Sequence, residues 1–215
     1  MCTLCRQVSF EIKGLEKRYY RCPNCDLFFL DPECHLSPEE EKERYTLHDN
    51  TCENKGYVAM FRRFIRKAVE PYKDTIRNAL DYGCGPGPVL KVLLEDMGIK
   101  TDIYDPYFFP SRVFQDKQYD LITCTEVLEH IADPLEAFNT FTAYLKVGGI
   151  LALMTRFRPP MDEFKEWWYR QDPTHVSFYS VRTFEWLARH FPLRLRYIDN
   201  RDTCVFEKVL SGSEK

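Results

Sequence analysis

Two pairs of cysteines near the start of the chain have the residue type and the spacing of a metal site. Cys2-x-x-Cys5 and Cys22-x-x-Cys25 are separated by 16 residues, a spacing typical of Cys₄ zinc sites. Each pair forms a tight turn that directs two thiolates toward one point, so two pairs complete a tetrahedron. Four thiolates leave no open position for water, so we expect Cys2, Cys5, Cys22 and Cys25 to hold a structural zinc ion.

The residues between the two pairs predict how the cysteines are brought together. Residues 8–12 alternate between apolar and polar side chains, Gly14 permits a turn, and residues 17–21 return. This pattern indicates a β-hairpin with a cysteine turn at each end, which is a zinc ribbon. A redox dithiol is the alternative, but a thioredoxin-like pair would lie at the start of a helix, and neither pair does.

A glycine-rich turn after an apolar strand is the second feature with chemical meaning. Residues 79–87 read Ala-Leu-Asp-Tyr-Gly-Cys-Gly-Pro-Gly, and Asp105 follows 18 residues after the last glycine. This is the layout of a nucleoside-binding βαβ unit, in which the glycines let the backbone turn sharply and approach the ligand. The distal carboxylate would then accept hydrogen bonds from the ribose hydroxyls. A glycine turn without a chemical role is the alternative.

The spacing of this turn excludes two common nucleotide sites. A dinucleotide-binding fingerprint, G-x-G-x-x-G, would need glycine where this chain has Pro88. No lysine follows the glycines, which excludes a phosphate-binding P-loop. The sequence therefore favours a nucleoside ligand whose recognition does not depend on a pyrophosphate.

The motif that remains resembles that of the class I S-adenosylmethionine (SAM)-dependent methyltransferases, and it consists of Asp81, Gly83, Gly85, Gly87 and Asp105. Two further segments resemble the same family: residues 119–134 match its fourth-strand motif, and residues 145–151 match the entry to its fifth strand. The resemblance covers about residues 76–210. A ribbon ahead of this domain, together with residues 172–178, resembles a small bacterial branch whose substrate is not established.

The resemblance implies which residues contact the cofactor. The residues it places around the methionine part of SAM are Asp81, Gly83, Cys84, Gly85 and Gly87. It implies that Asp105 binds the ribose and that Thr125 and Glu126 line the cofactor. Residues 106–118 are too few for the family's usual helix and third strand, so we expect a reduced sheet. The usual adenine contact after that strand is therefore left open: Asp116 or Gln115 could take its place, and Tyr107 with Phe108 could supply an apolar wall against the adenine.

Histidine is the side chain best suited to take a proton from a hydroxyl acceptor near neutral pH. His175 lies in an aromatic-rich loop after the expected fifth strand, a place where loops commonly carry substrate contacts. We expect His175 to act as a base or to orient the substrate, the alternative being a loop residue bonded to backbone. His48 is a second catalytic candidate, whereas His130 is expected to pack within its motif.

Alternating strands and helices must position these residues. Strands are expected at 78–82, 101–104, 119–124 and 149–155, helices at 89–97, 135–145 and 181–190, and a closing antiparallel pair at 194–198 and 203–209. This order predicts an α/β fold with a Rossmann-like, mostly parallel sheet and an antiparallel last strand. The ligand site of such a sheet lies beyond the carboxyl ends of its strands.

The expected domain organisation follows from these elements. Residues 1–32 form the zinc ribbon, 33–75 a helical linker or cap, 76–210 the methyltransferase domain and 211–215 a tail. The cap contains an amphipathic helix at 57–69 whose basic side carries Arg62, Arg63, Arg66 and Lys67. The plain interpretation of that side is a solvated face, and the alternative is recognition of an anionic group on the substrate.

The composition limits the class of partner. The net charge is −3, and residues 1–50 hold seven Lys or Arg against ten Asp or Glu. A protein bound to nucleic acid through phosphates usually has a basic excess, so a small-molecule methyl acceptor is favoured over RNA bound through the ribbon. A non-catalytic module that binds a protein through its ribbon is a third alternative, against which the intact glycines and Asp105 argue.

The distribution of apolar residues indicates in which cellular compartment the protein is expected. No run approaches the roughly 20 apolar residues of a membrane span, and the first residues lack the pattern of a signal peptide. We therefore expect no membrane segment, reduced cysteines and a cytoplasmic protein. The acceptor, the methylated atom and the oligomeric state are left open by the sequence.

Overall fold

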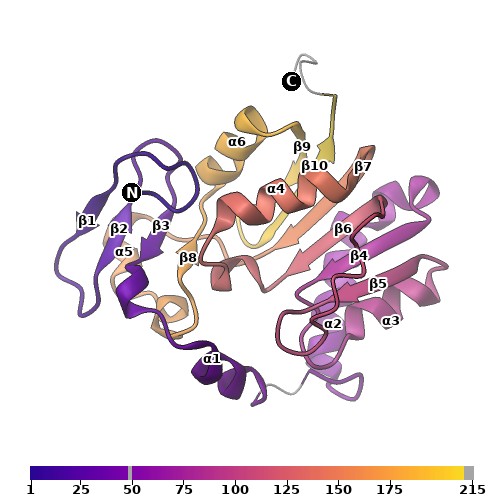
Figure 1. Ribbon diagram of the computed structural model, residues 1–215, viewed down its shortest axis with the longest axis horizontal. Helices are drawn as coiled ribbons and strands as arrows, with labels where there is room; N and C mark the ends of the chain where they lie inside the picture. Colours follow the sequence, from indigo (N-terminus) through magenta and orange to yellow (C-terminus); the bar gives the residue numbers. More distant parts are fainter. Residues whose placement is uncertain (48–49, 211–215) are drawn as a thin grey trace.

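The computed structural model describes residues 1–47 and 50–210, in which a central sheet has helices on both faces and a second, smaller sheet lies beside it (Figure 1). The helices are α1 (Pro38–Tyr45), α2 (Lys55–Ala68), α3 (Val89–Asp96), α4 (Pro134–Tyr144), α5 (Met161–Phe164) and α6 (Val181–His190). The strands are β1 (Phe10–Ile12), β2 (Tyr19–Arg21), β3 (Phe28–Leu30), β4 (Asn78–Tyr82), β5 (Lys100–Tyr104), β6 (Tyr119–Thr125), β7 (Leu145–Met154), β8 (Ser177–Phe178), β9 (Leu193–Ile198) and β10 (Thr203–Lys208).

The central sheet has the strand order β5-β4-β6-β7-β10-β9. The pairs β4–β5, β4–β6 and β6–β7 are parallel, whereas β10 is antiparallel to both of its neighbours. The predicted fold class is therefore confirmed. Among the described residues no strand lies beyond β5, and Asp105 forms only an isolated bridge with Phe109. The segment after β5 is thus too short to add a third strand, as its length predicts.

The two faces of the central sheet carry separate apolar layers because side chains alternate along each strand. On β7, Leu151 and Leu153 belong to the layer that also contains residues of α4 and α6. Ile150 and Ala152 belong to the opposite layer, with residues of α2 and α3. Strands β6 and β7 are buried on both faces along most of their length, which explains why β7 ends in a continuous apolar run at residues 150–154.

The small sheet contains the predicted cysteine ribbon and one strand from far along the chain. Its order is β1-β2-β3-β8, and β1 and β2 form the expected antiparallel hairpin. The sequence analysis did not include β3 or β8. Strand β8 pairs with β3 through Phe28 opposite Phe178 and Phe29 opposite Ser177. The ribbon, at the indigo end of the chain, therefore shares a sheet with the segment that follows His175 (Figure 1).

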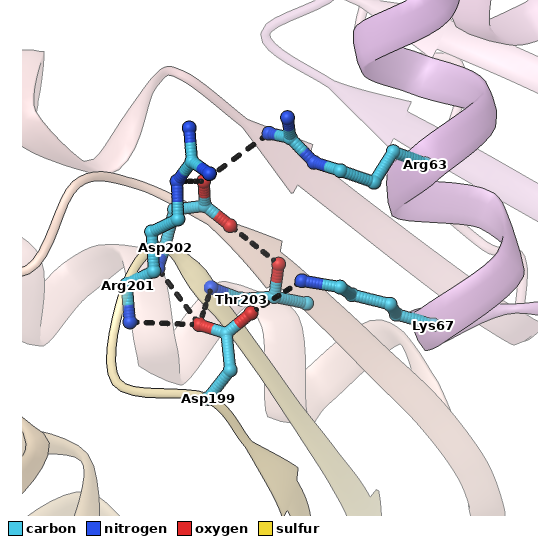
Figure 2. Close-up of polar contacts among 6 residues, drawn as sticks. All are labelled: Arg63, Lys67, Asp199, Arg201, Asp202 and Thr203. Atoms are coloured by element: carbon cyan, nitrogen blue, oxygen red, sulfur yellow. Dashed lines mark hydrogen bonds and ion pairs between the residues drawn. The ribbon is translucent and has the colours of Figure 1, made fainter.

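Helix α2 is attached to the turn between β9 and β10 by its basic side (Figure 2). Arg63 pairs with Asp202 at 3.3 Å, and Lys67 pairs with Asp199 at 2.7 Å. Arg62 and Arg66 are exposed. Half of the predicted basic side therefore holds the helix to the sheet, and the other half fits the expected solvated face.

Local capping explains where two helices begin. The Ser37 hydroxyl accepts from the Glu40 N–H while the Glu40 carboxylate accepts from the Ser37 N–H, which is a capping box at the start of α1. Ser180 and Thr183 form the equivalent pair at the start of α6. Among the described residues, no helix is both long enough and apolar enough to cross a membrane.

Candidate functional site

A cavity of about 580 Å³ opens beyond the carboxyl ends of β4, β5 and β6. One end is formed by the glycine turn after β4 and the turn after β5. The other end is formed by the segment after β6 and the loop at 168–175, while α1 and α2 contribute side walls. The site lies where a parallel α/β sheet is expected to bind a ligand.

Two glycines of the turn are required by close packing. Gly83 has a φ of +81°, and a Cβ there would lie 2.4 Å from the Cγ2 of Val127. A Cβ at Gly87 would lie 1.7 Å from the carbonyl oxygen of Asn50. The turn is therefore held between the segment after β6 and the chain before α2, and side chains at these positions would displace one or the other.

Asp105 connects the glycine turn to the end of β5. Its Oδ2 accepts from the Gly85 N–H at 3.0 Å, and its Oδ1 accepts from the N–H groups of Tyr107 and Phe108 at 2.9 and 3.1 Å. These bonds fix the carboxylate at the rim of the cavity. A backbone turn with alternating glycines beside an oriented carboxylate fits the ribose and amino-acid parts of SAM.

Asp81 lies beneath the turn instead of in the cavity wall. It is almost fully buried, and its Oδ1 accepts from the Thr123 hydroxyl at 2.9 Å. Burial raises the pKa of Asp81 to about 7, although the bond from Thr123 acts to lower it. The Asp81 side chain therefore does not contact the cavity, and its effect on the cavity is to support the backbone of the turn.

The structure brings together most of the residues that the sequence proposed for the site. Those that line the cavity are Gly83, Cys84, Gly85, Asp105, Tyr107, Thr125, Glu126 and His175. Asp81 and Gly87 do not line it. His48 lies outside the described residues, so its proposed role has no structural test.

Glu126 projects into the cavity from an uncommon backbone conformation. Its φ is +53°, and its N–H donates to the Met154 carbonyl at 2.7 Å, directly after β6. A left-handed conformation at a residue other than glycine is often found at functional sites. The Glu126 side chain is exposed to the cavity. Desolvation by the walls, and next the charge of Glu129, raise the pKa of this carboxyl to about 8.

Glu129, His130 and His175 form a polar cluster at the other end of the cavity. Glu129 is 1% exposed and accepts a hydrogen bond from the Tyr169 hydroxyl. His175 is 8% exposed, and the centroids of the two imidazole rings are 4.8 Å apart. Burial lowers the pKa of His175, so its neutral form is favoured. The sequence identified only His175 as a candidate within this cluster.

An ion pair joins α1 to the loop that carries His175. The Arg44 guanidinium donates to both carboxylate oxygens of Asp172, at 3.0 and 3.1 Å. Although burial acts to raise it, the bonds from Arg44 and then Thr174 hold the pKa of Asp172 well below its usual range. The Tyr107 hydroxyl donates to Glu41 of the same helix. Helix α1 thus contacts both ends of the cavity.

The four N-terminal cysteines form a separate cluster outside the cavity. Their sulfur atoms all lie within 4.8 Å of one another, with Cys2 to Cys25 at 3.5 Å and Cys5 to Cys22 at 3.3 Å. The two cysteine turns have the same backbone bonds: Arg6 N–H to Cys2 O at 3.1 Å, and Asp26 N–H to Cys22 O at 3.0 Å. Four thiols in two matching turns have the chemistry and the spacing to hold a metal ion.

Val176 connects the cysteine ribbon to the cavity. Its N–H donates to the Glu129 carbonyl at 2.7 Å, and its carbonyl accepts from the Leu30 N–H at 2.9 Å. Leu30 ends β3, and Val176 directly follows His175. The backbone of His175 is therefore held between the ribbon and the segment after β6.

The residues that the sequence predicts for the site do not include several of this second end, among them Glu129, Tyr169, Asp172 and Tyr45. Glu129 and His130 stand in the motif after β6, only three and four residues beyond Glu126. That spacing could have placed them near the cofactor. Tyr45 and Asp172 come from segments that the sequence alone gives no reason to bring together.

Comparison with known proteins agrees with this geometry. A family described as "Methyltransferase domain" matches residues 55–197. The ubiquinone biosynthesis O-methyltransferase of Klebsiella pneumoniae (strain 342) is 33% identical over 70 residues, which are 33% of this chain and 29% of that protein. The matched region thus spans about a third of the length of this curated relative.

Two solved structures resemble the fold at low sequence identity. One is a chain of the complex between the Haloferax volcanii Trm112 methyltransferase activator and a methyltransferase, with a TM-score of 0.58, 15% identity, and coverage of 82% of this chain and 97% of that chain. The other is the mitomycin 7-O-methyltransferase MmcR, with a TM-score of 0.57, 13% identity, and coverage of 82% and 59%.

The family match covers well over half of the chain, and the fold and the glycine turn agree with it. The chain therefore belongs to the methyltransferase domain family.

Proposed function

We propose that this methyltransferase transfers the SAM methyl group to a hydroxyl oxygen of a small molecule. The observation that carries the proposal is the division of one cavity into two ends. The glycine turn and Asp105 form a donor end, and the Glu129–His130–His175 cluster with its surrounding aromatic rings forms an acceptor end. The curated relatives named O-methyltransferases support oxygen as the methylated atom.

The residues of the two ends have different tasks in this proposal. SAM supplies a methyl group on a positively charged sulfur, so the protein mainly has to align a nucleophile with the sulfur–methyl bond. Asp105 and the glycine turn hold the ribose and the amino-acid part of the donor. His175 orients the acceptor hydroxyl or takes its proton, for which a neutral imidazole is suited. Thr125 and Glu126, at the end of β6, lie between the donor end and the acceptor end.

We further propose that the cysteine cluster holds a structural zinc ion. Cys2, Cys5, Cys22 and Cys25 fill a tetrahedral shell, so no position is left for a reactant. Support comes from the matching backbone bonds of the two cysteine turns and from sulfur atoms that lie close to one another. The ribbon then serves as a fixed support for Val176 and, through it, for His175.

The test separates binding of the donor from use of the acceptor. In the His175→Ala variant, turnover of SAM with a panel of phenols and alcohols is expected to fall by roughly 10²-fold or more, the usual contribution of a positioned proton acceptor. Affinity for S-adenosylhomocysteine, measured by isothermal titration, is expected to stay at the wild-type value. His190→Ala is the matched control, because His190 stacks on Trp186 at the end of α6. Unchanged turnover in His175→Ala would contradict the role of His175.

The same measurements decide between the alternatives. Failure of the wild-type protein to bind S-adenosylhomocysteine would favour a non-catalytic module. Tight RNA binding that weakens steeply with salt would favour an RNA acceptor, since phosphate contacts release counterions. The acidic balance of residues 1–50 argues against that outcome.

A further inference from the structure

We propose that Glu129, His130 and His175 bind a divalent transition-metal ion at the acceptor end of the cavity. Its catalytic use rests on the proposed function, whereas its binding does not. The site is distinct from the cysteine cluster in ligand type, in position and in having room for a reactant.

The three side chains are already close enough to share one ion. Their ligand atoms all lie within 4.8 Å of one another, so small rotations would bring each to a normal bond length. Glu129 and His130 come from one 3₁₀ turn, Leu128–His130, directly after β6. His175 comes from the loop before β8, and the Val176 N–H bond to the Glu129 carbonyl ties the two segments together.

The hydrogen bonds at Nδ1 fix the tautomer of the two imidazoles. His175 Nδ1 lies 2.7 Å from the Tyr169 carbonyl, and His130 Nδ1 lies 3.1 Å from the Thr174 carbonyl. A carbonyl oxygen can only accept, so Nδ1 carries the proton in each ring and Nε2 carries the lone pair. Metal-binding histidines commonly have this arrangement, because the bond at the other nitrogen fixes the tautomer and the ring orientation.

Glu129 supplies an independent sign that a partner is missing. Its Oε1 accepts from the Tyr169 hydroxyl, but its Oε2 is buried and has no hydrogen-bond partner among the residues that the structure describes. A buried carboxylate oxygen without a partner is unfavourable, and such groups are rare in folded proteins. A cation between Glu129 and the two imidazoles would provide that partner.

The donor set indicates the class of metal. Two imidazoles and one carboxylate favour Mn²⁺, Fe²⁺, Co²⁺ or Zn²⁺, whereas Mg²⁺ and Ca²⁺ prefer sites built from oxygen. Three protein ligands leave positions open for an acceptor oxygen or for water. All three residues line the cavity, so an acceptor in the cavity can reach those positions.

The chemical use follows from the charge of the ion. A hydroxyl bound to a divalent cation has a lowered pKa and gives its proton to water near neutral pH. The resulting oxyanion forms a bond to the methyl carbon of SAM, and the sulfur–methyl bond breaks with its electron pair remaining on sulfur. The products are a methyl ether and S-adenosylhomocysteine, so no oxidant or reductant is required. His175 then acts as a ligand that positions the acceptor through the metal.

Mn²⁺ is a suitable probe because it binds thiolates weakly and gives a paramagnetic resonance signal when free. The full chain is first loaded with one equivalent of zinc, which the four thiolates take up, so that Glu129, His130 and His175 stay open. It is then titrated with Mn²⁺, and free Mn²⁺ is measured by electron paramagnetic resonance. We expect one additional ion per chain. Glu129→Gln and His130→Asn are each expected to weaken binding by at least tenfold, whereas the controls Glu136→Gln and His190→Asn are expected to bind as the wild type does.

Two outcomes would overturn the proposal: no Mn²⁺ binding by the wild-type protein, or equal binding by both site variants. Glu129→Gln keeps an oxygen to accept from Tyr169, and His130→Asn changes a different residue of the same turn, so a folding defect in one leaves the other as a test. Binding of S-adenosylhomocysteine is measured on the same samples. A protein that binds S-adenosylhomocysteine but not Mn²⁺ refutes the metal site alone, and one that binds Mn²⁺ but not S-adenosylhomocysteine refutes the proposed function alone.

Discussion

The two ends of the cavity are built in different ways. The donor end comes from one short stretch, in which the turn after β4 and Asp105 after β5 bond directly to each other. The acceptor end is assembled from α1, the turn after β6 and the loop before β8. A ligand common to a whole family can be bound by a local motif, whereas a particular acceptor needs side chains gathered from distant segments.

The ribbon supports the acceptor end directly. Strand β3 pairs with β8, and Leu30 and Glu129 both bond to Val176. On the other side of the ribbon, Arg158 pairs with Asp26, which follows the second cysteine turn, and the Ser180 hydroxyl donates to the same Asp26 at 2.6 Å. Asp26 thus fixes the ribbon to both flanks of the segment between β7 and α6.

The largest expected effect is that of removing the proposed zinc. In Cys22→Ser the ion loses one of four ligands, and binding energies of structural zinc, about 10–16 kcal/mol, match or exceed the stability of a typical domain. We expect the ribbon to lose its order and turnover to be lost. S-adenosylhomocysteine should still bind, since the bonds between Asp105 and the glycine turn do not involve the ribbon.

Cys52→Ser is the matched control, because Cys52 is exposed and lies outside the cysteine cluster. Zinc content, amide hydrogen exchange at Leu30 and Val176, and isothermal titration with S-adenosylhomocysteine measure the three parts of the prediction. The proposed link between the ribbon and the acceptor end would be contradicted by one result. In that result, the Cys22→Ser protein contains no zinc but keeps its turnover and the protection of the Val176 amide from hydrogen exchange.

The next effect in size is at the donor end, in Gly83→Ala. The left-handed φ of +81° costs about 1–2 kcal/mol for a residue with a Cβ, and that Cβ would also contact Val127 at 2.4 Å. We expect affinity for S-adenosylhomocysteine to fall about tenfold or more, because the cradle must shift. Binding of Mn²⁺ at the other end should persist.

Gly98→Ala separates backbone strain from cofactor binding. Gly98 has nearly the same φ, +82°, but a Cβ there would meet nothing within 4 Å, and Gly98 does not line the cavity. This variant should be destabilised in thermal denaturation by the φ cost alone, about 1–2 kcal/mol, while its cofactor affinity is unchanged. Equal loss of affinity in the two variants would show that general strain, and not the cradle, controls binding.

The difference between the two ends of the cavity also explains which features the sequence could predict. The α/β fold class with its antiparallel last strand is confirmed, because it depends on a repeated alternation of strand and helix. The position of the glycine turn beside Asp105 and the closeness of the four cysteines likewise depend on short stretches of the chain. The reduced sheet is confirmed for the same reason, since it follows from the length of one segment.

The acceptor end could not be predicted in this way. The pairing of β8 with β3 joins residues that are about 150 positions apart, and no short-range pattern specifies such a contact. The bond between Arg44 and Asp172 crosses 128 positions. His130 was expected to pack within its motif, and only the approach of the 168–175 loop brings its ring against His175. Tertiary contacts, and not propensity, therefore define this end.

The smallest expected effect concerns a wall that both ends share. Helix α2 supplies Tyr57 and Met60 to the cavity, and Lys67 holds the helix to Asp199 (Figure 2). Although burial acts to raise it, the bonds from Lys67 and then from backbone N–H groups lower the pKa of Asp199 to about 2. A lowered carboxylate pKa stabilises the fold above the unfolded pKa of about 4, and this stabilisation is lost as the pH falls toward 2.

Asp199→Asn is therefore expected to cost about 1–2 kcal/mol of unfolding free energy at pH 7, after allowance for the partial exposure of the pair. Urea denaturation between pH 7 and pH 3 should show the difference from the wild type shrinking as the pH falls, with Asp74→Asn, an exposed carboxylate, as the control. Because Lys67 lies in the last turn of α2 and the cavity-lining Tyr57 lies in the first, cofactor affinity should change little. A difference that stays constant down to pH 3 would show that this ion pair does not anchor the wall, which would then depend on the apolar face of α2 and on the pair between Arg63 and Asp202.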